Sequence, residues 1–163
     1  MNNESLHRIA RTNDVGAFKE VIEAGANVNE KDKFGTTALH YSISEANHDI
    51  TRLLLEHGAD VMVQDDNGAT TLHYAVEYNA CDIAEALLKQ DEKVLGVADI
   101  HGNQPLWTAV FNARGSYEMV SLLLGYGADV THQNKVGTSP LDLAKRMGDD
   151  TLAASLERSL GSK

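Results

Sequence analysis

Histidine is the residue type in this chain with the clearest capacity for chemistry, because imidazole binds Zn²⁺ and exchanges a proton near neutral pH. Three of the seven histidines, His7, His40 and His73, recur at intervals of 33 residues. This regular interval puts them at one position in successive structural units, about 10 Å apart if neighbouring helices are in contact. A zinc ion with ligand bonds of about 2 Å does not span that distance. We therefore predict no metal site from these histidines.

Other short motifs also fall short of a catalytic or cofactor site. Residues 65–68 (DDNG) look like part of a calcium loop, but alignment on the glycine puts Val63 and Tyr74 at the outer ligand positions. The pair of glycines at 125 and 127 lacks the third glycine of a dinucleotide loop, and no G-x-x-x-x-G-K sequence occurs. No serine lies in a nucleophile elbow. The sequence predicts no catalytic residue, metal, cofactor or small-molecule substrate.

The single cysteine, Cys81, falls at the start of a predicted helix, where a lowered thiol pKa is possible. No neighbouring motif supports a catalytic role, and we favour a bystander thiol. One cysteine excludes an intramolecular disulfide and points to a reducing compartment. The sequence also shows no secretory signal and no membrane-spanning stretch, so we expect a cytoplasmic protein that does not bind membranes.

The elements that must position these residues follow a repeating plan. Four phrases, GTTALHYS, GATTLHYA, GNQPLWTA and GTSPLDLA, each open on a glycine, and the glycines are spaced by 33, 34 and 35 residues. Each phrase predicts a short first helix, and apolar residues at helical spacing after it predict a second. The recurring residues are Gly35, Gly68, Gly102 and Gly137, followed four residues later by Leu39, Leu72, Leu106 and Leu141. Repeats of this length stack into an array with one continuous core.

The chain resembles the ankyrin-repeat family, whose 33-residue unit contains the phrase T-P-L-H-x-A. The matching pieces are Leu39-His40, Leu72-His73, Pro105-Leu106 and Pro140-Leu141. The resemblance implies an all-α solenoid of helix-turn-helix units joined by short β-hairpin-like turns, and it implies that the histidine of the phrase is a structural hydrogen-bonding residue. We expect one domain, 1–163, with an N-terminal cap at 1–31, repeats at 32–64, 65–98 and 99–133, and a fourth repeat with the C-terminal cap at 134–163.

Two connections depart from the repeating plan. Residues 90–96 replace a Gly-Ala-Asp turn and are one residue longer, and residues 112–116 insert two residues between the helices of the third full unit. Lengthened connections in a rigid array either add partner-specific contacts or are simply tolerated. Both interpretations stay open at this point.

Charge is concentrated in the middle of the chain. The formal net charge is -10, and the segment from Asp32 to Asp99 holds 13 acidic and four basic residues. This field opposes binding to nucleic acid and favours a basic protein partner, although it also serves solubility.

The resemblance implies that hairpin tips and the exposed ends of first helices contact a partner. The predicted contact residues are Lys33, Phe34, Thr36, Ser44, Glu45, Asp66, Asn67, Glu77, Tyr78, Ile100, His101, Asn103, Trp107, Phe111, Asn112, Arg114 and Arg146. Among the aromatic residues, Phe34 and Tyr78 have no predicted core role. Trp107 replaces the histidine of the phrase, and it either packs between units or forms a binding hot spot.

The sequence therefore predicts a monomeric, non-enzymatic module that binds another protein through its concave face. One hypothesis is that it masks or inhibits its partner, as would a bacterial immunity protein that neutralises a basic toxin, because a short array without an effector domain acts mainly by covering a surface. A scaffold that joins two or more proteins is an alternative that uses the same face. A thiol- or histidine-dependent enzyme is the third and least supported alternative.

Overall fold

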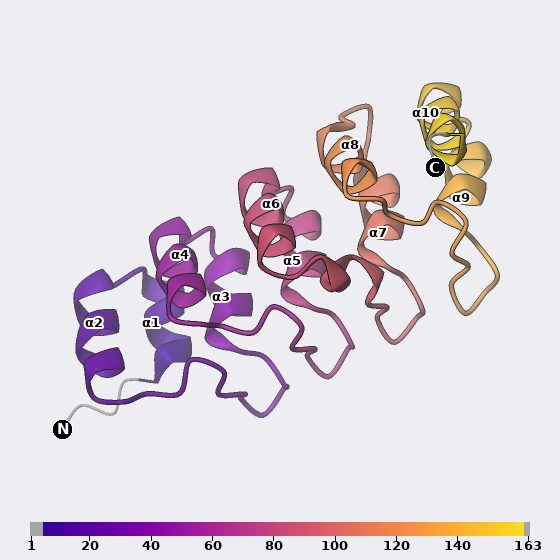
Figure 1. Ribbon diagram of the computed structural model, residues 1–163. Helices are drawn as coiled ribbons and strands as arrows, with labels where there is room; N and C mark the ends of the chain where they lie inside the picture. The colour runs from indigo at the N-terminus through magenta and orange to yellow at the C-terminus, as the bar shows by residue number, and fades with distance from the viewer. Residues whose placement is uncertain (1–4, 162–163) are drawn as a thin grey trace.

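The computed structural model describes residues 5–161 as an elongated row of helix pairs, with the two ends of the chain at opposite ends of the row (Figure 1). The elements of the described part of the chain are ten α-helices and one short 3₁₀ helix, with an isolated β-bridge between Gln64 and Thr70. The predicted all-helical repeat stack is confirmed. The first four residues of the predicted N-terminal cap and the last two of the C-terminal cap lie outside the described residues.

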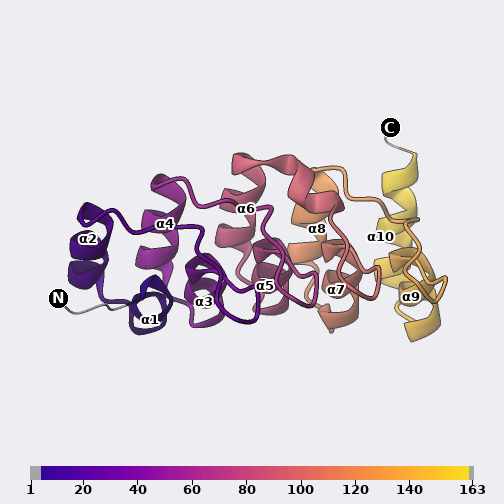
Figure 2. The same cartoon turned by 90° about the horizontal axis from the view of Figure 1, so that it is seen from below.

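Each helix pair consists of a first helix and a roughly antiparallel second helix. The pairs are α1 (Leu6–Thr12) with α2 (Val15–Glu23), α3 (Ala38–Ser44) with α4 (His48–Glu56), α5 (Thr71–Glu77) with α6 (Cys81–Gln90), α7 (Pro105–Asn112) with α8 (Glu118–Gly125), and α9 (Pro140–Met147) with α10 (Asp150–Leu160). The first helices pack against one another in one row, and the second helices form the other row (Figure 2). Loops that project from the row of first helices connect one pair to the next (Figure 1).

A carboxylate or amide side chain holds the turn of each connecting loop. Oδ1 of Asp32 accepts hydrogen bonds from the backbone N–H groups of Phe34 and Thr36, at 2.8 and 3.0 Å. The same two bonds recur at Asp65, Asp99 and Asn134. Such side-chain-to-backbone bonds favour turns because they satisfy N–H groups that no helix or sheet supplies with a partner. This explains why acidic residues cluster at the hairpins.

Neighbouring loops are joined tip to tip by backbone hydrogen bonds. The N–H of Asp66 donates to the carbonyl of Phe34 at 3.0 Å, and the N–H of Ile100 donates to the carbonyl of Asn67 at 2.9 Å. The fourth loop repeats the contact, since the N–H of Lys135 donates to the carbonyl of His101 at 2.9 Å. The tips therefore form a continuous edge along the array rather than independent flexible loops.

The core runs through all units and is built from repeated leucines. Leu54, Leu87, Leu123 and Leu156 of the second helices are all completely buried, as are Leu39 and Leu72 of the first helices. At the ends of the array, polar residues replace apolar ones: Glu20 on α2 and Glu157 on α10 are exposed. Terminal units of a solenoid need such wet outer faces because no further unit covers them.

The two lengthened connections take different forms. Residues 90–96 contain a 3₁₀ helix, Glu92–Gly96, that buries Val94 and Leu95. Residues 112–116 comprise the last residue of α7 and the loop that follows it; Asn112 and Arg114 are exposed and Ala113 is buried. The first insertion therefore closes over the core, whereas the second projects polar side chains outward.

Candidate protein-binding surface

The histidines that recur every 33 residues are structural hydrogen-bonding residues. At the start of α3, the N–H of Thr37 donates to Nδ1 of His40 at 3.3 Å, and Oγ1 of Thr37 lies 2.9 Å from the same nitrogen. At the start of α5, Thr70 and His73 repeat this arrangement at 3.1 and 2.9 Å. The imidazole thus takes the place of the carboxylate in a capping box. At the start of α9 the capping box has its usual carboxylate, which Asp142 supplies to Ser139.

The second ring nitrogen connects one unit to the next at His73 and His7, whereas Nε2 of His40 is buried without a hydrogen-bond partner in the described chain. Nε2 of His73 lies 3.1 Å from the carbonyl oxygen of Asn103, and Nε2 of His7 lies 3.1 Å from that of Thr36. Burial lowers the pKa of His40 to about 4, and burial also lowers the pKa of His73. Both imidazoles are therefore neutral at pH 7, as their role as hydrogen-bond acceptors at Nδ1 requires.

We expect folding stability to fall as the pH drops from 7 to 5. In the unfolded chain His40 binds a proton with a pKa near 6.5, whereas in the folded chain it does not until about pH 4. The unfolded state therefore binds more protons in this window, and His40 alone should reduce the free energy of unfolding by about 2 kcal/mol at pH 5. Urea unfolding at pH 7 and pH 5 measures this change. The variant His40→Gln should lose less stability over the window, while exposed His101→Gln should lose as much as the wild type; equal losses in all three chains would contradict the assignment.

One carboxylate of the calcium-like segment, that of Asp65, already has structural partners. Oδ1 of Asp65 accepts from the N–H groups of Asn67 and Ala69, both at 2.9 Å, and Oδ2 accepts from the hydroxyl of Tyr74 at 2.9 Å. Within residues 5–161 no group of three or more His, Cys, Asp or Glu side chains is arranged to hold a metal ion. The bonds of Asp65 to Asn67 and Ala69 make it a turn former, as the sequence predicted.

The environment of Cys81 opposes thiolate formation. Burial raises the pKa of the thiol, and the nearby carboxylates of Glu118 and Asp82 raise it further. The possibility of a lowered pKa at this helix start is therefore wrong, because the two carboxylates and partial burial outweigh the dipole of a short helix. The side chain is half-buried and packs against the core.

Exposed apolar side chains gather at the predicted contact positions. Among the described residues, the exposed large hydrophobic side chains are Phe34, Tyr78, Ile100, Phe111, Val136, Met147 and Leu160. All except Leu160 lie on a hairpin tip or at the carboxyl end of a first helix. Phe34, Tyr78 and Phe111 are 55%, 53% and 55% exposed. We call the six residues other than Leu160 the aromatic-aliphatic surface. Exposed apolar side chains are common binding anchors when they lie close together, and here they recur at the tips and first-helix ends of successive units.

The polar candidates are also mostly accessible. Lys33, Glu45, Asp66, Asn67, Glu77, His101, Asn112, Arg114 and Arg146 are exposed, and Ser44, Asn103 and Trp107 are half-buried. Thr36 must be removed from the contact set because its side chain is only 6% exposed. Its N–H is bonded to Asp32 and its carbonyl to His7, which hold it inside the turn.

Two charged candidates, Glu45 and Lys33, have intramolecular partners that the sequence did not predict. The carboxylate of Glu45 lies 3.8 Å from Arg11 of the N-terminal helix pair, and the Arg11 guanidinium lies 4.4 Å from the centre of the Tyr41 ring. The ammonium group of Lys33 lies 4.8 Å from the centre of the Phe34 ring. Both groups in each pair are exposed, and such contacts are weak in water. They orient the side chains without withdrawing them from a partner.

The structure shows the packing role of Trp107, one of the two roles that its sequence position leaves open. It packs against the core, but it makes no capping bond at the start of α7, where Gln104 and Pro105 begin the helix. Its ring stacks on Phe111, with centroids 5.6 Å apart and an angle of 13° between the planes. Its buried Nε1 has no hydrogen-bond partner within the described chain. Trp107 therefore packs against the core and stacks on the exposed ring of Phe111, and its role as a contact stays a prediction.

No helix within residues 5–161 has the length and apolar character needed to cross a membrane. This finding concerns helices of the described part of the chain.

Comparison with known proteins identifies the repeating unit. One family model, described as "Ankyrin repeats (3 copies)", matches residues 6–97, and a second, described as "Ankyrin repeat", matches residues 101–135. A mouse protein, "Ankyrin repeat, SAM and basic leucine zipper domain-containing protein 1" [Mus musculus], is 36% identical over 53 residues. That match covers 32% of this chain and 11% of the mouse protein, so it concerns only a small part of that relative.

Proposed function

The chain belongs to the ankyrin-repeat family of protein-interaction modules, and we propose that it acts without catalysis, by binding a basic partner protein through the hairpin tips and the ends of its first helices. The observation that carries this proposal is the aromatic-aliphatic surface, which leaves Phe34, Tyr78 and Phe111 more than half exposed along one array. Exposed aromatic side chains on rigid elements are costly in water and act as anchors at protein interfaces.

The charge around these anchors supports a basic partner. Exposed Glu45, Asp66 and Glu77 lie at neighbouring tips and helix ends, within the segment that holds 13 acidic and four basic residues. An acidic field around apolar anchors speeds association with a basic protein and disfavours acidic competitors. Binding should therefore weaken as the salt concentration rises, because exposed charges are screened over about 10 Å at 0.1 M salt.

Within this proposal, binding inhibits the partner by covering its basic surface. A nuclease toxin whose substrate groove is basic would be such a partner, and neutralising it would make the chain an immunity protein. The captured partner, once identified, can be assayed for its activity with an equimolar amount of this chain. Inhibition that is reduced by neutralising Glu45, Asp66 and Glu77 together supports the proposal, whereas full activity in the complex contradicts the inhibitory role.

The test of the binding surface is affinity capture from a native lysate of the source organism, followed by mass spectrometry. The variant Phe34→Ala/Tyr78→Ala/Phe111→Ala should lose the bound partner and still melt like the wild type, since all three rings are exposed. The control variant Arg52→Ala/Glu56→Ala alters exposed residues of α4, in the row of second helices, and should retain the bound partner. Equal capture by the triple variant and the wild type would show that the partner uses another face.

A further inference from the structure

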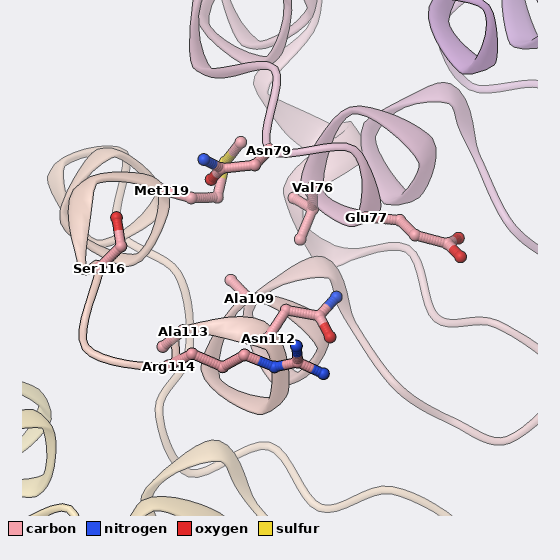
Figure 3. A pocket seen from close by; sticks show the side chains of 9 residues that line it. All are labelled: Val76, Glu77, Asn79, Ala109, Asn112, Ala113, Arg114, Ser116 and Met119. Carbon is pink, nitrogen blue, oxygen red and sulfur yellow. The ribbon is translucent and has the colours of Figure 1, made fainter.

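We propose that a cleft between the second and third full units is a specificity pocket for a bulky apolar side chain of the partner, next to a lysine or arginine. This inference rests on the proposed function and deepens it, because it assigns the chemistry of one partner segment. The cleft has a volume of about 540 Å³ and lies between the carboxyl ends of α5 and α7 and the start of α8 (Figure 3). Pockets that hold side-chain-sized and larger ligands span about 300–1,000 Å³.

The floor of the cleft is apolar. Val76, Ala109, Ala113 and Met119 line it and are all buried. Figure 3 shows Met119 extending toward Asn79, Arg114 running beside Asn112, and Glu77 pointing away from the other lining side chains. A hydrocarbon or aromatic side chain that entered would replace water against these four residues, which is favourable in proportion to the apolar area covered.

The repeats themselves provide a reference for this cleft. The matching cleft between the first and second full units has a volume of about 240 Å³, and His48 and Asp82 pair at its lining with a distance of 3.3 Å. The loop between α7 and α8 is two residues longer than the loop between α5 and α6. The larger volume therefore coincides with the insertion, which makes this pocket a feature of one unit and not of the repeat in general.

The backbone of the inserted loop is strained at an exposed arginine. In the shorter loops one residue, Ala46 or Asn79, has a positive φ of 54°. In the longer loop two consecutive residues have positive φ, Arg114 at 42° and Gly115 at 87°. Side chains other than glycine, asparagine and aspartate rarely adopt this conformation, and such strain concentrates at sites of function. Here it places a guanidinium group at the margin of the cleft.

The polar margin indicates what accompanies the apolar side chain. Glu77 and Arg114 are the two charged residues that line the cleft. Two further acidic residues, Asp82 and Glu118, are exposed at the starts of α6 and α8. Asn79 and Asn112 supply amide groups that pair with a peptide backbone, and Arg114 can donate to its carbonyl oxygens. The exposed rings of Tyr78 and Phe111 border the same helix ends. The segment that fits is thus apolar at its tip and basic beside it.

A blocked peptide tests the pocket directly. We would titrate the isotope-labelled full chain with acetyl-Lys-Trp-Lys-amide at millimolar concentrations and record the backbone amide signals by NMR. Saturable shifts centred on Asn79, Asn112 and Arg114, several-fold smaller with acetyl-Lys-Ala-Lys-amide, are expected. Absence of saturable shifts, or shifts centred on another face, would overturn the pocket.

Two variants separate the pocket from general stickiness. Deleting Arg114 and Gly115 gives the loop the length found in the first two full units, and the shifts should disappear while the amide spectrum stays that of a folded chain. Glu77→Arg leaves the loop intact and should make acetyl-Glu-Trp-Glu-amide bind better than acetyl-Lys-Trp-Lys-amide. Glu56→Arg, in the row of second helices, should leave the preference for acetyl-Lys-Trp-Lys-amide unchanged. An unchanged preference in Glu77→Arg would overturn the charge assignment.

The outcomes distinguish this inference from the proposed function. If the peptide does not bind but the triple aromatic variant still loses the captured partner, the pocket fails and the binding surface stands. If the peptide binds at the cleft and the loop-shortened chain loses the captured partner while the triple variant keeps it, the pocket stands and the proposed surface fails. If the loop-shortened chain captures the partner as well as the wild type does, the pocket fails.

Discussion

Leu87→Asp should abolish cooperative folding of the array. Leu87 is 0% exposed in the middle of α6, which contacts α5, α8 and the 3₁₀ helix. A carboxylate there would be buried without a partner, at a cost of several kcal/mol beyond the lost apolar burial. A domain of this size is stable by about 5–15 kcal/mol, and in a solenoid each unit depends on its neighbours. Loss at a central unit therefore affects both sides of the array.

Thermal melting followed by circular dichroism measures this effect. The control is Ser121→Asp, which adds the same carboxylate to an exposed position of α8, and its free energy of unfolding should stay within about 0.5 kcal/mol of the wild type. A retained cooperative transition near the wild-type temperature in Leu87→Asp would show that the register of the second helix is wrong.

Gly68→Ala should destabilise the chain more than Gly137→Ala, although both glycines have the same φ of 71°. A Cβ atom at position 68 would lie 2.9 Å from the backbone nitrogen of Ile100, which donates to Asn67 in the edge of hairpin tips. A Cβ atom at position 137 would have nothing within 4 Å. The left-handed conformation costs about 1–2 kcal/mol at both sites, and the close approach adds to it only at position 68.

Urea unfolding of the two single variants isolates this extra cost. We expect Gly137→Ala to lose about 1–2 kcal/mol and Gly68→Ala to lose clearly more, because backbone rather than a flexible side chain must move. Equal losses would mean that the loops separate easily and that the tip-to-tip bonds contribute little. Gly137→Ala is an internal control, because among the described residues no further loop lies against the loop at Gly137, whereas the loop of Ile100 lies against that of Gly68.

The two surface tests also depend on this rigidity. If the tips form one edge, Phe34 and Ile100 keep a fixed distance along the array, and a partner that binds them does not have to order them. Binding to pre-organised side chains avoids an entropy cost of about 0.5–1.5 kcal/mol for each immobilised side chain. A loss of the edge in Gly68→Ala should thus weaken capture of the partner even under conditions where the chain stays folded.

Most of the candidate contact residues are exposed, because local patterns determine their exposure. Phe34 precedes a turn glycine, and Tyr78 ends a first helix, so neither position faces the core in any unit. Sequence inspection failed at Thr36 because burial there depends on a bond from His7, 29 residues away. For Cys81 the sequence favoured a bystander thiol but left a lowered pKa possible, whereas burial raises the pKa and Glu118 in the next unit raises it further. Both environments involve a neighbouring unit.

The sequence alone determined the period of the repeat, the two helices of each unit and the continuous core, and the family resemblance implied that the histidines of the phrase are structural; that they cap helices came from the tertiary structure. The motifs behind these features recur every 33 to 35 residues, so the spacing of residues close together in the chain predicts them. Only the tertiary structure decided how far apart neighbouring helix ends lie, and hence that the insertion at 112–116 accompanies a cleft of about 540 Å³ where the preceding units have about 240 Å³. The physical reason is that secondary structure follows from contacts within a unit, whereas the cleft, its strained arginine and its charged margin arise where the side chains of two units meet.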